Sequence, residues 1–508
     1  MEPGDGDERG REHTPGSATR VAQRCPAPRP CAPGDRGTEP AVARPHWRDY
    51  APRPPHRPET PVPATASSFW NPKTETLPKD QLRALQLAKL QRLVDRAWHR
   101  SPFHRRLYER AGVTPDRIRT LDDLRRLPFM TREDWMANQA EKPLFGDLIT
   151  RPETDAIRYH LTSGTSGRQP LRVLDSRKDW SWITDMWCYG FWGFGIRPTD
   201  KVFFAFSYGS FIGFWGAHYC CEKLGCLTLA SGNMTTEQRV KQIVELGVTV
   251  VCATPTYALR MGQTAEKMGI DLRRDGKVRR VVVSGEPAGS IPAVKKMIED
   301  MWGGKCGDTA GMTEIGTIMI FECDHQPGGP HIIEDHFIEE VLDPDTGEPV
   351  PYGERGERVV TSFGRGFIPL LRYRTKDLVN KVPHTRCSCG RTGDIYEGGI
   401  LGRVDDMKLI RGTNVYPRAV EAVVREHAQV EEFQIVIERK DNVQDEITVK
   451  VELKPGLDAE WPRLQQQLGK DLADAHEGLR FNVELCKQGE LPRFELKAKR
   501  LQDLRPQY

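Results

Sequence analysis

Residues 249–287 read TVVCATPTYALRMGQTAEKMGIDLRRDGKVRRVVVSGEP, and their pattern indicates the fold class. Its β-branched runs at Thr249–Ala253 and Val281–Ser284 predict strands, and Tyr257–Met268 between them has the apolar spacing of a helix. A strand, a helix and a second strand in this order form a βαβ unit with parallel strands. The alternation extends in both directions, with a strand predicted at Val202–Phe206 and helices at Thr236–Leu246 and Pro292–Met301.

After Glu340 the pattern changes to short strands joined by turns such as DPDTGEP at 343–349. The last hundred residues predict a small α+β unit, with a helix at Ala419–Glu426 and strands at Gln434–Glu438 and Glu446–Leu453. We therefore expect an α/β fold. A large N-terminal domain (67–402), with mainly parallel sheets plus a small β-rich subdomain, precedes a small α+β C-terminal domain (403–508).

The composition argues against two classes of function. The 508 residues carry 74 Lys+Arg and 71 Asp+Glu, a formal net charge of +3. This balance is not that of a globally basic nucleic-acid surface or of an acidic solvating tail. Residues 1–66 hold 14 of the 38 prolines and ten arginines but no lysine, so we expect a disordered tail there.

Cysteine usage and the N-terminus indicate the cytoplasm. Twelve cysteines are too few for a disulfide scaffold in a chain of this length. The opening residues, MEPGDGDERGREH, mix acids with bases and lead into no apolar signal region. In a reducing compartment, clustered cysteines point to metal binding or catalysis.

One uncharged run, Val202–Cys221 (VFFAFSYGSFIGFWGAHYCC), is just long enough to span a bilayer. Gly209, Gly213, Gly216 and His218 interrupt it without forming a single face. This pattern favours a buried strand, a glycine-rich turn and a helix of small residues. We expect no membrane contact.

The first motif with chemical potential is LTSGTSGRQP at 161–170. Hydroxyl residues interleaved with glycines let successive backbone N–H groups surround a phosphate. The motif is not a Walker A loop, because no Gly-Lys-Ser/Thr follows. The alternative is a polar surface turn.

The second motif joins VVVSGEP at 281–287 to GDTAGMTEIG at 307–316. A buried strand that ends in Ser-Gly-Glu-Pro exposes backbone at the carboxyl edge of a parallel sheet, where such sheets bind ligands. Glu314 is a candidate Mg²⁺ ligand, because that ion favours one or two carboxylates plus phosphate oxygens. The alternative for Glu314 is a carboxylate at a helix start.

Two further motifs lie nearer the C-terminus. In LRYRTKDL (371–378), Asp377 can accept both hydroxyls of a ribose, and in LGRVDDMKLIRG (401–412), Arg403 can pair with a phosphate or the same ribose. An ordinary salt-bridged hairpin is the alternative. In ELPRFELKAKR (490–500), a lysine could deliver positive charge to a transition state, or the segment is a solvated basic tail.

Taken in this order, the motifs resemble those of the adenylate-forming acyl/aryl-CoA ligases. The opening from Phe69, FWNPKTETLPKDQLRALQLAKLQRLVDRAWHRSPFHRRLYERAGV, resembles the phenylacetate–CoA ligase branch. The resemblance runs from about Phe69 to Arg505. The segments that carry it are 162–170, 285–287, 309–314, 373–377, 402–412 and Lys497.

The resemblance implies a two-step reaction with ATP, Mg²⁺ and coenzyme A. A carboxylate attacks the α-phosphate to give an acyl-adenylate and pyrophosphate. The small C-terminal domain, a mobile lid, then rotates, and a thiol displaces AMP. By resemblance, Ser163, Gly164, Thr165, Ser166 and Gly167 hold the β- and γ-phosphates; Gly285, Glu286 and Pro287 flank the adenine; Asp308 and Thr309 lie against the nucleotide; Thr313 touches the α-phosphate; Glu314 holds Mg²⁺; Asp377 and Arg403 bind ribose and phosphate; Asp405 is the hinge; and Lys497 stabilises charge in adenylation.

The sequence departs from the family pattern at four places. Two residues, Arg168 and Gln169, precede Pro170 where the family has one. Gly307-Asp308-Thr309 supplies no aromatic ring for the adenine. Lys376 stands where the family has glycine, and bulky residues at 494 and 496 replace the small ones before Lys497. These departures bear on the efficiency of adenylation and on the position of Lys497.

A separate set, Cys323, His331, Cys387 and Cys389, has the donor types of a structural zinc site. Cys-Ser-Cys-Gly presents two thiolates from one tight turn, with Gly390 relieving the backbone. His325 or His336 could replace His331. Some members of the ligase branch carry a similar set and bind zinc. Unligated buried cysteines are the alternative.

The acyl pocket is assigned to aromatic-rich sequence, with Tyr208, Gly209, Phe211 and Phe214 as candidate lining residues; core packing is the other role open to them. The leading function is ATP-dependent activation of an aromatic acid and its transfer to coenzyme A. Its partners are small molecules, without nucleic acid or membrane, and a homodimer is one candidate assembly.

Three other functions stay open at this point. The acyl group could pass to a carrier protein or an amine instead of coenzyme A. The enzyme could adenylylate a deazaflavin cofactor, as some relatives do, so that AMP stays on the product. A zinc-stabilised nucleotide-binding module without catalysis is the non-enzymatic alternative.

Overall fold

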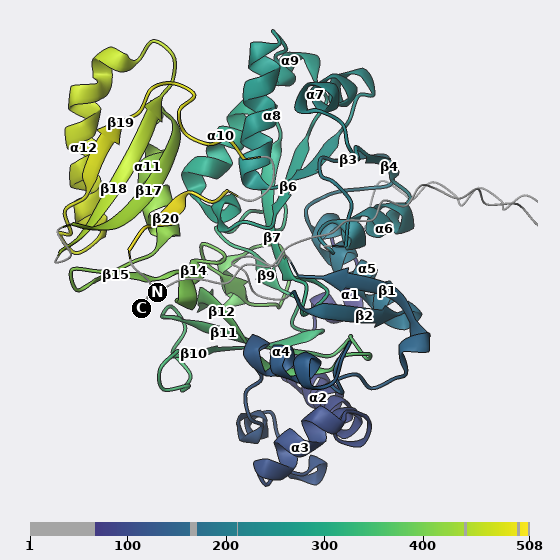
Figure 1. The fold of residues 1–508 in the computed structure, drawn as a ribbon. Helices are drawn as coiled ribbons and strands as arrows, with labels where there is room; N and C mark the ends of the chain where they lie inside the picture. Colours follow the sequence, from purple (N-terminus) through teal and green to yellow (C-terminus); the bar gives the residue numbers. More distant parts are fainter. Residues whose placement is uncertain (1–66, 163–169, 211, 441–443, 495–497, 506–508) are drawn as a thin grey trace, which may run out of the picture. The chain divides into compact units, whose positions relative to one another are not determined.

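The computed structural model describes residues 67–162, 170–210, 212–440, 444–494 and 498–505 (Figure 1). Its largest element is a 12-stranded sheet. The strands are β3 (Lys201–Phe204), β4 (Leu227–Ala230), β5 (Val250–Ala253), β6 (Arg280–Ser284), β7 (Lys305–Met312), β8 (Thr317–Phe321), β9 (His331–Ile332), β10 (Phe337–Leu342), β11 (Arg355–Ser362), β12 (Leu370–Val382), β13 (Ile395–Tyr396) and β14 (Gly402–Arg403).

The sheet is parallel in one half and antiparallel in the other. Its order is β10-β11-β12-β13-β9-β8-β7-β6-β5-β3-β4, with β14 paired to β12. The strands from β4 to β7 run parallel, and every pairing from β7–β8 to β10–β11 is antiparallel. The predicted α/β fold is confirmed, and the β-rich part forms the antiparallel half of the same sheet.

Helices connect the parallel strands, as the βαβ pattern predicts. The α-helices are α1 (Pro72–Glu75), α2 (Lys79–Arg100), α3 (Pro102–Arg110), α4 (Arg132–Glu141), α5 (Arg177–Gly193), α6 (Trp215–Leu224), α7 (Thr236–Glu245), α8 (Pro255–Lys267), α9 (Leu272–Asp275), α10 (Pro292–Trp302), α11 (Pro417–Glu426) and α12 (Trp461–Ala475). The 3₁₀ turns are η2 (Pro115–Arg117), η3 (Asp122–Arg126), η4 (Glu153–Asp155), η5 (Pro287–Ser290), η6 (His384–Arg386), η7 (Val404–Asp406) and η8 (Asp458–Glu460).

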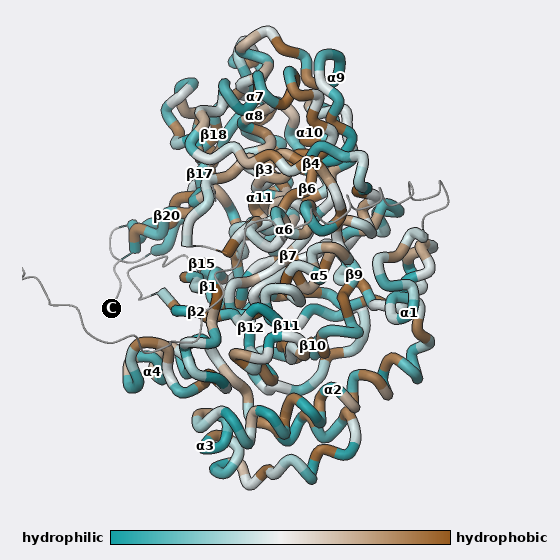
Figure 2. Tube along the Cα trace, turned by 90° about the vertical axis from the view of Figure 1, so that its right-hand side faces the viewer, coloured by the Kyte–Doolittle hydropathy of each residue, from teal (hydrophilic) through white to brown (hydrophobic). Residues whose placement is uncertain are grey.

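The helices before the sheet follow their local sequence signals. Ser101 caps α3 by accepting a hydrogen bond from the His104 N–H, with Pro102 at the first helical position. Along α2, hydrophilic and hydrophobic residues alternate (Figure 2), and the apolar ones, such as Leu90 and Val94, are fully buried. The amphipathic pattern therefore fixes the buried face of α2.

The uncharged run from Val202 to Cys221 is part of this folded core. It begins in strand β3, where Phe203 and Phe204 are fully buried, and ends in α6, where Cys220 and Cys221 are fully buried. Over the described residues, no helix has both the length and the apolar character needed to cross a bilayer. The predicted strand, turn and helix are confirmed.

The C-terminal part has its own sheet and core. The sheet has the order β19-β18-β17-β20, and its strands are β17 (Val430–Lys440), β18 (Gln444–Leu453), β19 (Asn482–Leu485) and β20 (Leu501–Asp503). Residues of α11 and α12 complete its hydrophobic core. The hairpin of β15 (Lys408–Ile410) and β16 (Thr413–Val415) contributes Ile410 and Val415 to the same core. The predicted α+β unit is confirmed, and the boundary at 402/403 stays a prediction.

A buried arginine, Arg365, joins three distant segments of the large domain. It forms two hydrogen bonds with Asp175 on β2 (Arg172–Ser176), at 2.7 and 2.8 Å; β2 pairs with β1 (Ala156–Leu161) in a separate sheet. Its remaining Nη1 donates to the carbonyls of Thr313 and Glu314, at 3.0 and 2.6 Å. Both charged side chains are almost inaccessible to solvent. Arg365 therefore fixes the turn between β7 and β8.

Replacing Asp175 with Asn should destabilise the protein strongly, because the buried guanidinium loses its counter-charge. We expect Asp175→Asn to lower the free energy of unfolding in urea by about 3–5 kcal/mol. The matched control is Asp300→Asn, which breaks the exposed Lys296–Asp300 pair on α10 and should change it by less than about 0.5 kcal/mol. Equal, small changes in both variants would contradict this role of Arg365.

Candidate active site

The two segments predicted to flank the nucleotide base lie side by side in the sheet. Strand β6 ends at Ser284, directly before Gly285, and pairs in parallel with β7, so that Ser284 is opposite Thr309. The Thr309 hydroxyl donates to the Val283 carbonyl at 3.2 Å. These segments form the carboxyl edge of the parallel strands, where α/β sheets bind ligands.

Asp308 is a buried carboxylate at this edge. The Ser290 hydroxyl of η5 donates a hydrogen bond to it. Two glycines permit the close packing: a Cβ at Gly289 would lie 2.6 Å from the Asp308 carboxylate, and one at Gly399 would lie 2.0 Å from the Ser290 hydroxyl. Burial raises the pKa of Asp308 to about 7. Near neutral pH this group can therefore either accept or donate a proton.

Glu314, the predicted Mg²⁺ ligand, lies in the turn between β7 and β8 and not at a helix start. Arg132, the first residue of α4, donates to Glu314 at 2.7 Å and to the Thr162 hydroxyl at 3.0 Å. Thr162 opens the predicted phosphate loop and is buried, like Glu314. Arg132 thus brings Thr162 and the Glu314 carboxylate together, a contact that the sequence analysis did not predict.

The predicted ribose pair is formed by adjacent strands. Asp377 on β12 is opposite Arg403 on β14, and Arg403 Nη1 lies 3.3 Å from Asp377 Oδ1. Burial raises the pKa of Asp377, while the charges of Arg403 and Arg358 act in the opposite direction. Arg403 also pairs with Asp405, the predicted hinge residue in η7, at 2.9 Å. A carboxylate beside a guanidinium suits a sugar hydroxyl and a phosphate.

Lys376 takes a left-handed backbone conformation that favours glycine. Its φ is +63°, in the left-handed region that costs a residue with a side chain about 1 kcal/mol. Its ammonium lies 3.1 Å from the Glu133 carboxylate at the start of α4. Arg132 and Glu133, successive residues, therefore reach Glu314 and Lys376 on the two sides of the site.

Part of the predicted site lies outside the described residues. The described chain stops at Thr162 and resumes at Pro170, with the Leu171 N–H donating to the Thr162 hydroxyl at 3.0 Å. Within the C-terminal motif, Ala498 is the first described residue after Lys497, and its N–H donates to Glu286. The predicted residues outside the description are Ser163, Gly164, Thr165, Ser166, Gly167, Phe211 and Lys497.

The candidate acyl-pocket residues lie in an aromatic cluster. Phe214 is 5% exposed and packs against the rings of Phe204 and Phe206. The Tyr208 hydroxyl lies 2.9 Å from His218 Nδ1. Gly209 is exposed, and its carbonyl accepts a hydrogen bond from Trp215. Their role in binding an acid stays a prediction.

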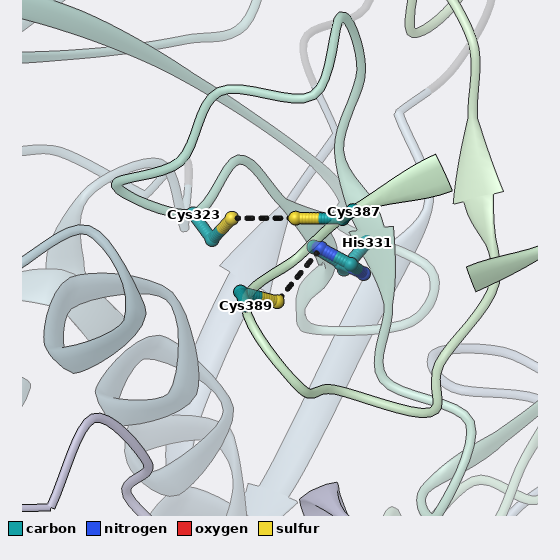
Figure 3. A group of neighbouring side chains, drawn as sticks. All are labelled: Cys323, His331, Cys387 and Cys389. Atoms are coloured by element: carbon teal, nitrogen blue, oxygen red, sulfur yellow. Dashed lines mark hydrogen bonds between the residues drawn. The ribbon is translucent and has the colours of Figure 1, made fainter. Parts of the chain in front are cut away.

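Cys323, His331, Cys387 and Cys389 form one compact buried group (Figure 3). Their candidate ligand atoms all lie within 4.8 Å of one another. Cys323 faces Cys387 with 3.6 Å between sulfurs, and Cys389 faces His331 with 3.4 Å between Sγ and Nε2. His331 Nδ1 lies 3.0 Å from the Gly393 carbonyl, which leaves Nε2 directed at the cysteines.

The two other candidate histidines point elsewhere. His325 is exposed, with its Nδ1 3.1 Å from the Ser388 hydroxyl. His336 accepts a hydrogen bond from the Trp182 indole at 2.9 Å. Gly390 has a φ of +85°, so it relieves the turn as predicted. Of the three histidines considered, His331 is therefore the one in the cluster.

Comparison with known proteins gives matches over most of the chain. The family model of the AMP-binding enzymes matches residues 109–364, and that of the AMP-binding enzyme C-terminal domain matches residues 412–505. The phenylacetate-coenzyme A ligase of Thermus thermophilus is 35% identical over 455 residues, which cover 86% of this chain and all of that protein. The Escherichia coli phenylacetate-coenzyme A ligase is 33% identical over 438 residues, covering 85% and 97%.

Solved structures of 2-hydroxyisobutyryl-CoA ligase share the fold and resolve two states. The structure in the postadenylation state, in complex with 2-HIB-AMP, aligns with a TM-score of 0.82 at 30% identity and covers 87% of this chain and 94% of that one. The structure in the thioesterification state, with 2-HIB-AMP and CoA, aligns with a TM-score of 0.66 at 31% identity over the same shares. Matching sequence, fold and site segments agree with the resemblance of the motifs: the chain belongs to the AMP-binding enzymes, in the branch of the phenylacetate–coenzyme A ligases.

Proposed function

We propose that this protein is an AMP-forming acid–thiol ligase for an aromatic acid of the phenylacetate kind. ATP and the acid would give an acyl-adenylate and pyrophosphate, and coenzyme A would then take the acyl group. The observation that carries the proposal is the bridge by Arg132 from Thr162 to Glu314, because it brings the first residue of the candidate phosphate motif to the candidate metal ligand. The relatives named phenylacetate-coenzyme A ligase support the choice of acid and acceptor.

The residues divide the nucleotide between them. The segment 163–167 would cradle the β- and γ-phosphates and Thr313 would contact the α-phosphate. Gly285, Glu286 and Pro287 would flank the adenine, with Asp308 and Thr309 beside it. Asp377 and Arg403 would take the ribose and phosphate, which their pairing at 3.3 Å supports. Glu314 fits a Mg²⁺ site of one carboxylate completed by phosphate oxygens, and the bound ion would neutralise charge on the triphosphate.

The chemistry explains why so much positive charge is needed. A carboxylate oxygen attacks the α-phosphorus, the bond to the pyrophosphate oxygen breaks, and pyrophosphate leaves with its negative charges. Lys497 and Arg132, which are far apart in the sequence, would both stabilise that charge. The thiolate of coenzyme A then attacks the acyl carbon, and AMP leaves as a good leaving group. Rotation of the lid at Asp405 would let one pocket serve both steps.

The group of Cys323, His331, Cys387 and Cys389 would hold a structural zinc ion. A tetrahedral site with Zn–S bonds of about 2.3 Å and a Zn–N bond of about 2.0 Å places two sulfurs about 3.8 Å apart, and a sulfur and a nitrogen about 3.5 Å apart. The observed separations are 3.6 Å between the sulfurs of Cys323 and Cys387 and 3.4 Å between Cys389 Sγ and His331 Nε2, which match that size. The Gly393 carbonyl would fix the His331 tautomer, as is usual for histidine ligands. The cytoplasmic location and a homodimer stay predictions.

A half-reaction assay tests the ligase proposal. With ATP, Mg²⁺ and phenylacetate, we expect pyrophosphate and a bound acyl-adenylate, and on adding coenzyme A we expect AMP and thioester in equal amounts. Lys497→Ala should slow pyrophosphate formation by about a hundredfold or more, because it removes a charge that stabilises the transition state. Lys499→Ala, at an exposed position two residues on, is the matched control and should leave the rate unchanged.

Other outcomes of this assay would point elsewhere. Acyl transfer only when a holo carrier protein or an amine replaces coenzyme A would change the acceptor. A product that retains AMP, seen by mass spectrometry with a deazaflavin, would change the reaction. No pyrophosphate from a broad panel of aryl acids would overturn the proposal.

Metal analysis tests the zinc site independently of activity. We expect about one zinc ion per chain by plasma mass spectrometry, lost in Cys389→Ser, because a hydroxyl is a much weaker ligand than a thiolate. The thermal midpoint of that variant should fall, since metal binding contributes to folding free energy. The control is Cys486→Ser, outside the group, which should keep both the metal and the midpoint. Metal-free protein that takes up no added zinc would exclude the site.

A further inference from the structure

Glu286, in the middle of the Gly-Glu-Pro segment after β6, is held from two sides. On the large-domain side, the Thr256 hydroxyl at the start of α8 donates to it at 2.7 Å. On the C-terminal side, the Ala498 N–H donates to it at 2.9 Å. One half-buried carboxylate therefore bridges the two parts that the reaction must move relative to each other.

The neighbours of Glu286 belong to the same contact. The Pro287 carbonyl accepts a hydrogen bond from Arg418 on α11 at 3.3 Å, and Arg418 also donates to the Gly398 carbonyl at 2.8 Å. Arg500 Nη1 lies 3.4 Å from the Thr256 hydroxyl, which is the other partner of Glu286. Two successive residues of the Gly-Glu-Pro segment thus bind the C-terminal domain.

Burial and the charges of the C-terminal domain shift the pKa of Glu286 in opposite directions, with a net rise. Burial raises the pKa of Glu286, and the hydrogen bonds from Thr256 and Ala498 and the positive charge of Arg500 act against that rise. Glu421 on α11 adds a repulsive charge, and it is itself paired with Arg500 at 3.2 Å. Separating the domains would remove Ala498 and Arg500 from the carboxylate together.

Covalent geometry makes this contact relevant to catalysis. The Ala498 nitrogen is bonded directly to the carbonyl carbon of Lys497, so the anchored N–H belongs to the peptide group that joins the two residues. Glu286 therefore anchors the chain at Ala498, directly after the predicted catalytic lysine. An anchor of this kind is how a residue remote from the chemistry can govern the placement of a catalytic group.

We propose that Glu286 is a positioning residue that holds Ala498, and with it the C-terminal domain, in place for acid activation and must release it before thioester formation. This inference rests on the proposed function. The contact is made in a structure that aligns better with the postadenylation state of 2-hydroxyisobutyryl-CoA ligase than with its thioesterification state. Glu286 contributes through the segment that it holds, without contact to the reacting atoms.

The two half-reactions measured separately test this role. In Glu286→Gln, the amide can still accept from Ala498, but the bond is no longer charge-assisted, so we expect the single-turnover rate of pyrophosphate release with phenylacetate to fall about tenfold. Thioester formation from synthetic phenylacetyl-AMP and coenzyme A should stay within about twofold of the wild-type rate, because the contact is already broken in that step. Glu286→Asp, whose shorter side chain cannot reach both partners, should show the same split.

The matched control is Glu421→Gln. It removes a carboxylate from the same Arg500 but leaves the bond between Glu286 and Ala498, so the ratio of the two rates should not change. Thermal midpoints are recorded for every variant, and a split between the half-reactions remains informative even where the midpoint falls. Equal losses in both half-reactions, or a change of ratio in Glu421→Gln, would overturn the positioning role. A wild-type protein without pyrophosphate release would instead overturn the proposed function.

Discussion

The site depends on a single buried ion pair, that of Arg365 with Asp175. Five N–H donors of one guanidinium are a liability in a protein interior unless each finds an acceptor. Here four of the contacts are filled by the carboxylate of Asp175 and by the carbonyls of Thr313 and Glu314. The requirement to satisfy this arginine holds the β7–β8 turn rigidly, and the turn in turn presents Glu314. The hydrogen bonds that stabilise Arg365 in the core thus also set the position of Glu314.

The first turn of α4 also contributes charged side chains to the site. Arg132 faces Glu314 and Glu133 faces Lys376, so one helix start supplies both signs of charge. Each pair joins the helix to a segment that carries a predicted nucleotide-binding residue, Glu314 itself or Asp377. A ligand rich in negative charge would draw on Arg132 and Lys376, while Mg²⁺ at Glu314 would release Arg132 for a phosphate. The same residues therefore balance one another's charges in the absence of a ligand and would bind a charged ligand when it is present.

Local sequence patterns predicted the helices and strands, but they did not predict the contacts between residues far apart in the sequence. The strands at 250–253 and 280–284, the helix between them and the Ser101 cap all follow from periodicity and capping chemistry within a few residues. Arg132 and Glu314 are 182 residues apart, and Arg365 and Asp175 are 190 apart. A basic residue after a capping threonine carries no mark of its distant partner. The Cys/His group was predictable because its donor types are rare and specific, whereas the aromatic residues near Tyr208 have the same composition in a core and in a pocket.

The Gly-Glu-Pro segment links nucleotide binding to the motion of the C-terminal domain. Its outer residues lie where the adenine is expected, and its glutamate and proline contact the C-terminal domain. If the nucleotide orders this segment, it stabilises the contact with Ala498, and by thermodynamic reciprocity the contact must tighten nucleotide binding by the same factor. The hydrogen bond between Ala498 and Glu286 then favours activation and opposes release of the lid. It must therefore be strong enough for the first step and weak enough to break before the second. The half-buried Glu286 carboxylate, shared between Thr256 and Ala498, satisfies both requirements, because it still accepts a hydrogen bond from Thr256 after Ala498 has left.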